Sequence, residues 1–191
     1  MAVTFLTENA AGTTTVTDQA YHLSQGRIWL RGDVNQDMAK DFASQLMWAE
    51  DLALPVVIYL DSPGGDVIAG LTIIDLMTMS SVPIDIVCMG KAYSMGAMIL
   101  ACAGKGRRHI LPHAKVMIHQ PWTGDVSGTA SNIRERADSL LSTQNTLVDL
   151  IVEHTGHKRK EVEKDMSYDH FFSAEEAITY GLVDDVWKAV R

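Results

Sequence analysis

The 191-residue chain has 16 basic and 24 acidic residues, so its formal net charge is −8 at pH 7. Its hydrophobic content of 47% indicates one globular domain with a sizeable core. An acidic chain without a basic tract argues against nucleic acid and anionic membrane surfaces as its main partners.

The N-terminal segment shows no hydrophobic periodicity. Residues 1–26 are rich in Thr and Ala, and we expect them to form a flexible arm. The opening residues, MAVTFLTENAAGTTTVTDQ, lack a positively charged start and have only a short apolar patch, so they do not predict a signal peptide. The longest apolar stretch, GAMILACAG, is too short to span a bilayer. We therefore expect a cytoplasmic protein with no membrane partner.

Beyond the arm, short apolar runs alternate with segments of helical spacing. In chain order we expect strand 27–32, helix 35–51, strand 55–60, helix 65–80, strand 84–89, helix 93–104 and strand 115–119. The run PVVIYL is continuous and β-branched, which is typical of a parallel strand covered on both faces. Strands followed by helices predict an α/β fold with right-handed crossovers.

The last third of the chain has a different pattern. Apolar and small residues recur at helical spacing over about residues 128–154, which predicts a long helix that projects instead of alternating with strands. The segment HTGHKRKEVEKDM predicts a glycine-stopped end followed by a charged helix. Ser173 and Gly181 are expected to cap the two ends of a short helix. We expect residues 27–191 to form a single domain.

The two cysteines, Cys88 and Cys102, both lie in apolar surroundings. This favours buried, reduced thiols over a disulfide. The spacing of cysteines and histidines does not suggest a zinc site, and we expect neither a metal nor another cofactor.

The stretch YLDSPGGDV follows an expected strand and opens an expected helix. Gly64 and Gly65 allow the backbone to turn sharply and to present its N–H groups. The positive end of the helix dipole adds to them, so the turn suits a phosphate or an oxyanion. An ordinary β–α turn is the alternative.

A second candidate is Ser94 in AYSMG, again between a strand and a helix. The arrangement resembles a nucleophile elbow, although Ala92 stands where the first glycine is usual. The N–H of Met95 is then directed at the same space, while a plain helix cap is the alternative. His119 ends the strand KVMIH and is the kind of base that Ser94 would need. A core or capping histidine is its alternative, and the spacing does not select an acid partner.

Together, three stretches resemble the proteolytic subunit of the Clp protease, in order from about residue 27 to 186: YLDSPGGDVIAGLTIIDLM, CMGKAYSMGAMILACAGKGRRHILPHAKVMIHQP and FFSAEEAITYGLVDDV. The resemblance implies the spiral ββα fold of the crotonase superfamily, with the long helix as a projecting handle. It implies a serine endopeptidase with a catalytic triad of Ser94, His119 and Asp169. The backbone N–H groups of Gly65 and Met95 would form the oxyanion hole.

The same resemblance implies partners. Similar proteins are homo-oligomers of two stacked seven-membered rings, and a ring-shaped AAA+ unfoldase feeds them unfolded polypeptide. Tyr59, Met79 and Trp187 match positions of the hydrophobic cleft that holds the unfoldase, although scattered apolar residues are an alternative explanation for each.

Two departures leave other hypotheses open. Ser167 and Tyr168 replace an acidic–arginine pair that reports ring contact in the family, and Ser127–Gly128 stands where Gln-Gly is usual. A second isoform, or a phage-type protease that processes capsid proteins, fits these departures. Further alternatives are a non-catalytic ring subunit, an acyl-CoA hydratase on the same superfold, and a Ser–Lys peptidase that uses Lys91.

Overall fold

The fold was analysed in a computed structural model, which describes residues 4–9, 12–125 and 127–188. The strands are β1 Thr4–Asn9, β2 Gly12–Thr17, β3 Arg27–Arg31, β4 Val56–Ser62, β5 Ile84–Tyr93, β6 Arg108–Ile110, β7 Lys115–Ile118, β8 His170–Phe172 and β9 Asp185–Val186. The helices are α1 Asp18–Leu23, α2 Gln36–Asp51, α3 Val67–Met79, α4 Met95–Ala101, α5 Ala130–Thr155, α6 Arg159–Asp165 and α7 Ala174–Tyr180. Within the described residues, no helix is long and apolar enough to cross a membrane.

The main sheet is parallel along the order β3-β4-β5-β6-β9, as the alternation of strands and helices predicts. Strand β5 is ten residues long and divides between two partners. Its Ile86–Cys88 portion pairs with β6, whereas its Lys91–Tyr93 portion pairs with β7. Strand β8 then pairs antiparallel with β7. The carboxyl end of β5 therefore lies beside β7, and β8 lies one strand further on.

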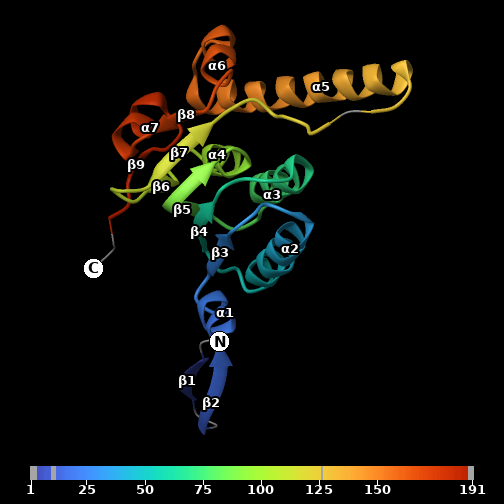
Figure 1. The fold of residues 1–191 in the computed structure, drawn as a ribbon. Coiled ribbons are helices and arrows are strands. Elements are labelled where there is room, and N and C mark those ends of the chain that lie inside the picture. The colour runs from blue at the N-terminus through green and yellow to red at the C-terminus, as the bar shows by residue number, and fades with distance from the viewer. Residues whose placement is uncertain (1–3, 10–11, 126, 189–191) are drawn as a thin grey trace.

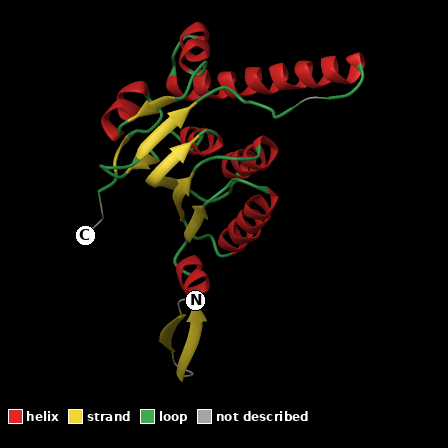
Figure 2. Cartoon of the chain, in the orientation of Figure 1, coloured by secondary structure: helices red, strands yellow, loops and turns green. Residues whose placement is uncertain are grey.

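Helices α2 and α3 lie together on one side of the sheet (Figures 1 and 2). The residues that β4 turns toward them, such as Ile58 and Leu60, are completely buried. The residues that β4 turns the other way, such as Val57 and Tyr59, are only half-buried. The prediction that this strand is covered on both faces is thus wrong for the chain alone, because the described residues bury one face of β4 completely and the other only in part.

The long helix α5 projects from the body of the molecule, as predicted (Figure 1). Its 26 residues correspond to about 39 Å at 1.5 Å per residue. Its buried residues are Leu147, Val148 and Ile151, all near its carboxyl end. That end packs on the core, and the amino-terminal part extends beyond it.

The segment expected to form an N-terminal arm has regular secondary structure that its lack of periodicity did not indicate. Strands β1 and β2 form an antiparallel hairpin, and α1 follows with Thr17 as its N-cap. The run of threonines explains the strands, since β-branched residues favour extended backbone. The flexibility of this segment stays a prediction.

The short helix α7 confirms both predicted caps. The Ser173 hydroxyl accepts a hydrogen bond from the Glu176 amide, and Gly181 adopts the left-handed conformation at the other end. Cys88 and Cys102 are buried and free, also as predicted.

Candidate active site

Ser94 stands between β5 and α4 in a backbone conformation that serine rarely adopts, with φ +52° and ψ −121°. Its N–H donates to the Met117 carbonyl on β7 at 2.8 Å, and its carbonyl accepts from Ala97 in the first turn of α4 at 2.9 Å. The serine side chain makes no capping hydrogen bond to the helix. The simple helix-cap explanation of this serine is therefore wrong.

The turn SPGG packs against Ser94 from the neighbouring strand end. Gly64 has φ +96°, and a Cβ added to it would lie 2.7 Å from the Ser94 Cβ. The buried Ser62 hydroxyl accepts a hydrogen bond from the Gly64 amide at 3.0 Å. On the other side, a Cβ on Gly96 would lie 3.2 Å from the Ser62 carbonyl oxygen. The two motifs SPGG and SMG thus interlock, and glycine at these positions allows the close approach.

His119 follows β7 and faces Ser94. Its Nε2 lies 2.7 Å from the Ser94 Oγ. Its Nδ1 lies 3.3 Å from a carboxylate oxygen of Asp169. A proton on Nδ1, the nitrogen facing the carboxylate, leaves Nε2 free to accept a proton from the serine hydroxyl.

The pairing of β7 with β8 brings Asp169 to this histidine. Ile118 lies opposite His170 in the antiparallel register, so the next residue of one strand and the preceding residue of the other are neighbours. The histidine side chain is 18% exposed and the aspartate side chain is 63% exposed in the chain alone. The structure brings Ser94, His119 and Asp169 into one constellation, although they are separated by up to 75 positions.

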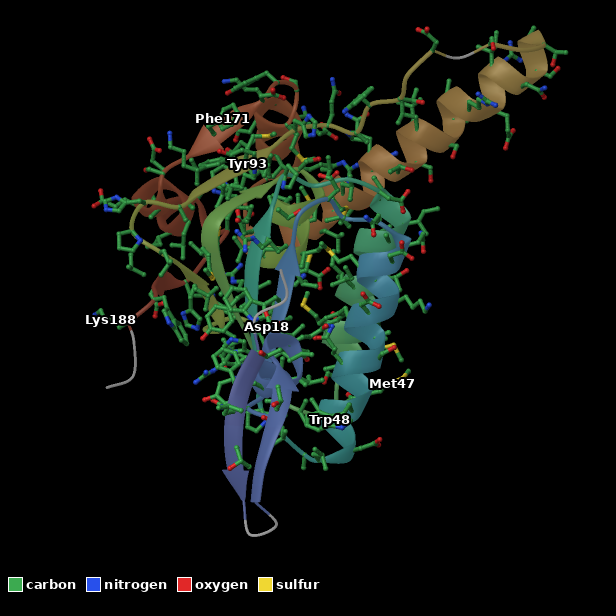
Figure 3. All side chains as sticks on the ribbon, turned by 60° about the horizontal axis from the view of Figure 1, so that its bottom comes forward. Asp18, Met47, Trp48, Tyr93, Phe171 and Lys188 are labelled. Atoms are coloured by element: carbon green, nitrogen blue, oxygen red, sulfur yellow. The ribbon has the colours of Figure 1, made fainter. Side chains whose placement is uncertain are left out.

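An aromatic contact ties the ends of β5 and β8 together. The ring of Tyr93, directly before the serine, packs edge to face against the ring of Phe171, with centroids 5.5 Å apart. Figure 3 shows the two side chains beside each other. Met117 lies between them, because it pairs with Tyr93 on β5 and with Phe171 on β8. This contact links the residue before Ser94 to the strand that follows Asp169, and the sequence pattern does not predict it.

The two candidate oxyanion donors lie on either side of the glycine turn. Gly65 forms a bridge with Val34, and it has φ +149°. A Cβ added to Gly64 would lie 3.0 Å from the Met95 nitrogen, so the turn lies directly against the start of α4. Among the hydrogen bonds between described residues, none has the N–H of Gly65 or of Met95 as its donor. Both donors are therefore available to an oxyanion.

Other candidate nucleophiles and bases are less suitable. Burial raises the pKa of the Cys88 thiol to about 12, with a smaller contribution from Asp61. Burial likewise raises the pKa of Cys102 to about 12. Both thiols stay protonated at neutral pH and are poor nucleophiles. The backbone amide of Lys91 contacts Asp61, while the group within hydrogen-bond distance of Ser94 Oγ is the His119 imidazole.

A groove of about 510 Å³ adjoins the site. Its lining includes Gly65, which precedes α3, and Ile68 in the first turn of α3. Trp122, three residues after His119, and one face of α5 complete it. Ile68 and Trp122 are 69% and 77% exposed, respectively. The sequence predicts the helices and strands around this groove but not the residues that line it.

Two of the three residues predicted to hold an unfoldase, Tyr59 and Trp187, belong to one face of the sheet, and the third, Met79, ends α3. Tyr59 stacks on Trp29 with ring centroids 4.9 Å apart, and Trp187 packs against His109 with centroids 4.8 Å apart. Tyr59 and His109 lie on the same sheet face, because both are in register with the same residue of β5. Met79 ends α3 and is 83% exposed.

The fold and the site define a mixed α/β protein in which a serine at a strand-to-helix seam contacts a histidine. A comparison with protein families gives the particular family: the family model for Clp protease matches residues 10–190. The chain therefore belongs to the Clp protease family, a family of serine peptidases. The match confirms the predicted resemblance and the predicted fold class, with α5 as the projecting helix.

Proposed function

We propose that the chain is a serine endopeptidase that hydrolyses peptide bonds of unfolded polypeptides, with Ser94 as nucleophile. The observation that carries this proposal is the 2.7 Å contact between the Ser94 Oγ and the His119 Nε2. The strained serine backbone supports it, because such strain is concentrated at functional sites. Asp169 is the proposed third member of the triad.

The proposed reaction has two halves. The imidazole of His119 takes the hydroxyl proton while the Ser94 oxygen attacks the peptide carbonyl carbon. The N–H groups of Gly65 and Met95 donate to the oxygen that becomes negative. When the tetrahedral intermediate collapses, the C–N bond breaks, and the imidazolium gives its proton to the leaving amine.

The second half releases the acyl group from the serine. A water molecule gives a proton to His119 as its oxygen attacks the ester carbonyl. The C–O bond to Ser94 breaks, the serine regains a proton from the imidazolium, and a carboxylic acid leaves. Asp169 stabilises the charged imidazole in both halves.

Self-compartmentalised assembly belongs to the same proposal. We propose two stacked heptameric rings of identical chains, because family members assemble in this way. Exposed apolar residues on the projecting helix support a contact with another copy, in particular Ile133 and Leu141. An AAA+ unfoldase is the proposed partner that delivers protein substrates, with Tyr59, Met79 and Trp187 at its docking surface.

The central test is labelling with a fluorophosphonate, which reacts with activated serines. We expect the full-length chain to be labelled and to cleave peptides. Ser94→Ala should abolish both activities and leave particle size unchanged. Ser142→Ala on the exposed part of α5 is a matched control and should behave like the unmodified chain.

Two outcomes would contradict the proposal. Undiminished labelling of Ser94→Ala would exclude this serine as the nucleophile. Assembled particles of the unmodified chain that show neither labelling nor peptide cleavage would favour the non-catalytic ring subunit.

A further inference from the structure

The groove beside Gly65 has apolar walls and one positively charged residue. Ile68 and Trp122 contribute the apolar side chains, and α5 contributes Arg136 and Leu140. An exposed apolar groove next to a proposed nucleophile is a suitable binding surface for substrate side chains. The basic group is unexpected, because the chain as a whole is strongly acidic.

The spacing of residues on α5 explains how the arginine reaches the groove. Arg136, Ser139, Leu140 and Thr143 all line it, and their spacing of three, four and seven positions places them on one helix face. The inner end of this stripe is fixed near the triad, since the Gln144 amide donates to the side chain of Gln120 at 3.4 Å. Gln120 directly follows His119.

Arg136 thus lies at the outer end of the stripe. Seven residues separate it from Thr143, which corresponds to about 10 Å along the helix. An extended substrate advances about 3.3 Å per residue. For a substrate that lies along this stripe with its cleaved bond at the inner end, the guanidinium is about three substrate residues from that bond.

The charge of Arg136 is available to a ligand. None of the ion pairs between described residues includes it. The neighbouring acids Glu135 and Asp138 lie on other faces of α5, one and two positions away. The acidic residue that lines the groove is Asp66, whose carboxylate accepts hydrogen bonds from the Ala69 amide at 2.7 Å and from Gln36 at 3.2 Å.

We propose that Arg136 is a specificity-determining residue that selects an acidic substrate side chain about three residues from the cleaved bond. Apolar substrate side chains on the intervening residues pack between Ile68 and Trp122. The proposal rests on the proposed peptidase function, and it names a substrate class for that site. A guanidinium recognises a carboxylate by charge and by its planar pair of N–H donors.

The test uses internally quenched ten-residue peptides with a leucine at the cleavage point, confirmed by mass spectrometry. A single Glu, or Gln as its neutral counterpart, occupies each of the four positions on either side in turn. At one position about three residues away, we expect kcat/KM to be about threefold to tenfold higher for Glu. The ratio should fall toward one in high salt, because salt screens an exposed ion pair.

Two variants separate recognition from a general structural effect. Arg136→Gln should reduce the Glu/Gln ratio at that position to about one. Arg134→Gln removes the same charge two residues away, outside the groove lining, and should keep the preference. Arg136→Lys should keep part of the preference for the Glu peptide.

Binding gives an independent measurement that needs no turnover. Fluorescence anisotropy of the same peptides with Ser94→Ala should show tighter binding of the Glu peptide, and Ser94→Ala combined with Arg136→Gln should lose that difference. Equal binding and cleavage of Glu and Gln peptides at every position would overturn the specificity proposal. Loss of all cleavage with the Glu preference in binding retained would instead overturn the proposed peptidase function alone.

Discussion

The backbone of Ser94 is held against its own preference. A non-glycine residue with positive φ costs of the order of 1–3 kcal/mol and persists only where its surroundings determine the conformation. Here the Met117 carbonyl and the first turn of α4 fix the serine peptide groups, and Gly64 packs directly on its Cβ. These contacts direct the hydroxyl at His119 instead of at the helix terminus.

Asp169→Asn tests the role of the carboxylate beside the imidazole. The amide favours the wrong imidazole tautomer, and in serine proteases with such a triad this change lowers turnover by about 10,000-fold. Asp169 is 63% exposed in the chain, so we expect a loss of about 100- to 10,000-fold. The decrease should appear in kcat and leave KM nearly unchanged, measured per assembled particle.

Asp165→Asn is the matched control for the aspartate variant. Asp165 accepts a hydrogen bond from the Tyr180 hydroxyl at 2.9 Å and lies 3.7 Å from His170. Its removal should lower thermal stability and preserve kcat. Near-normal turnover of assembled Asp169→Asn particles would rule out the triad role of Asp169.

At the scale of single residues, the sequence predicts part of the candidate active site. Ser94 and His119 stand in recognisable positions after buried strands. Asp169 follows only from the family resemblance, because it is adjacent to the histidine through a strand pairing between distant segments. The stripe that includes Arg136 was not predictable in its role, since it depends on how α5 is oriented relative to α3.

The elements are joined by a buried arginine. Arg108 on β6 is 3% exposed, and its Nη1 donates to the carbonyls of Ala101, His154 and Gly181. These carbonyls lie at the carboxyl ends of α4, α5 and α7, where the helix dipoles are negative. Asp184 pairs with the same guanidinium at 2.6 Å. One ionic cluster therefore fixes three helix ends, including that of the projecting helix α5.

Asp184→Asn should leave this buried cation without a charged partner. We expect the free energy of unfolding to fall by about 3–5 kcal/mol at pH 7, measured by urea denaturation. The exposed neighbouring pair of Arg107 and Asp85 is the control, and Asp85→Asn should cost less than about 1 kcal/mol. Equal stability of Asp184→Asn and the unmodified chain at pH 7 would contradict this role of the cluster.

The same variant has a defined pH dependence. Burial alone raises the pKa of Asp184, but hydrogen bonds and charge from Arg108, with the Gly106 amide, outweigh burial and hold the pKa below the ordinary 3.8. A depressed folded-state pKa stabilises the protein above 3.8, and this contribution is lost as pH falls through the folded-state value. The stability difference between the unmodified chain and Asp184→Asn should therefore be constant from pH 7 to about 5 and narrow below about pH 4.

The sequence predicts the helices and the apolar strands well but misses a short strand with polar residues. Helices α2, α3 and α5 and strands β4 and β7 follow apolar periodicity closely, and their ends agree within a few residues. Strand β6 was missed, because a three-residue strand that includes two basic or imidazole side chains resembles a loop. The arginine in it is buried only through partners that come from distant parts of the chain.

For the whole molecule, the important surface is the sheet face opposite α2 and α3. Trp29 and Tyr59 lie side by side on neighbouring strands, and His109 continues the same row two strands further on. Trp187 packs on that histidine. Met47 and Trp48 lie instead on α2, on the other side of the sheet (Figure 3). Partly exposed aromatic rings in a row are typical of a protein–protein contact.

If the row of aromatic residues receives an AAA+ unfoldase, its loss should separate two activities. Tyr59→Ala or Trp187→Ala should reduce ATP-dependent degradation of a folded protein by about tenfold or more, since buried aromatic residues often dominate binding energy. Cleavage of a short quenched peptide should change much less, because such a peptide reaches the active site by diffusion. Trp48→Ala removes an equally large side chain from α2, 39% exposed, and should change both activities to the same extent. The measurement is the ratio of the two rates, with the AAA+ unfoldase of the same genome as the delivering partner. An equal loss of protein degradation and peptide cleavage in Tyr59→Ala and Trp187→Ala would indicate a folding or assembly defect, whereas unchanged protein degradation by correctly assembled particles of both variants would exclude this face as the docking surface.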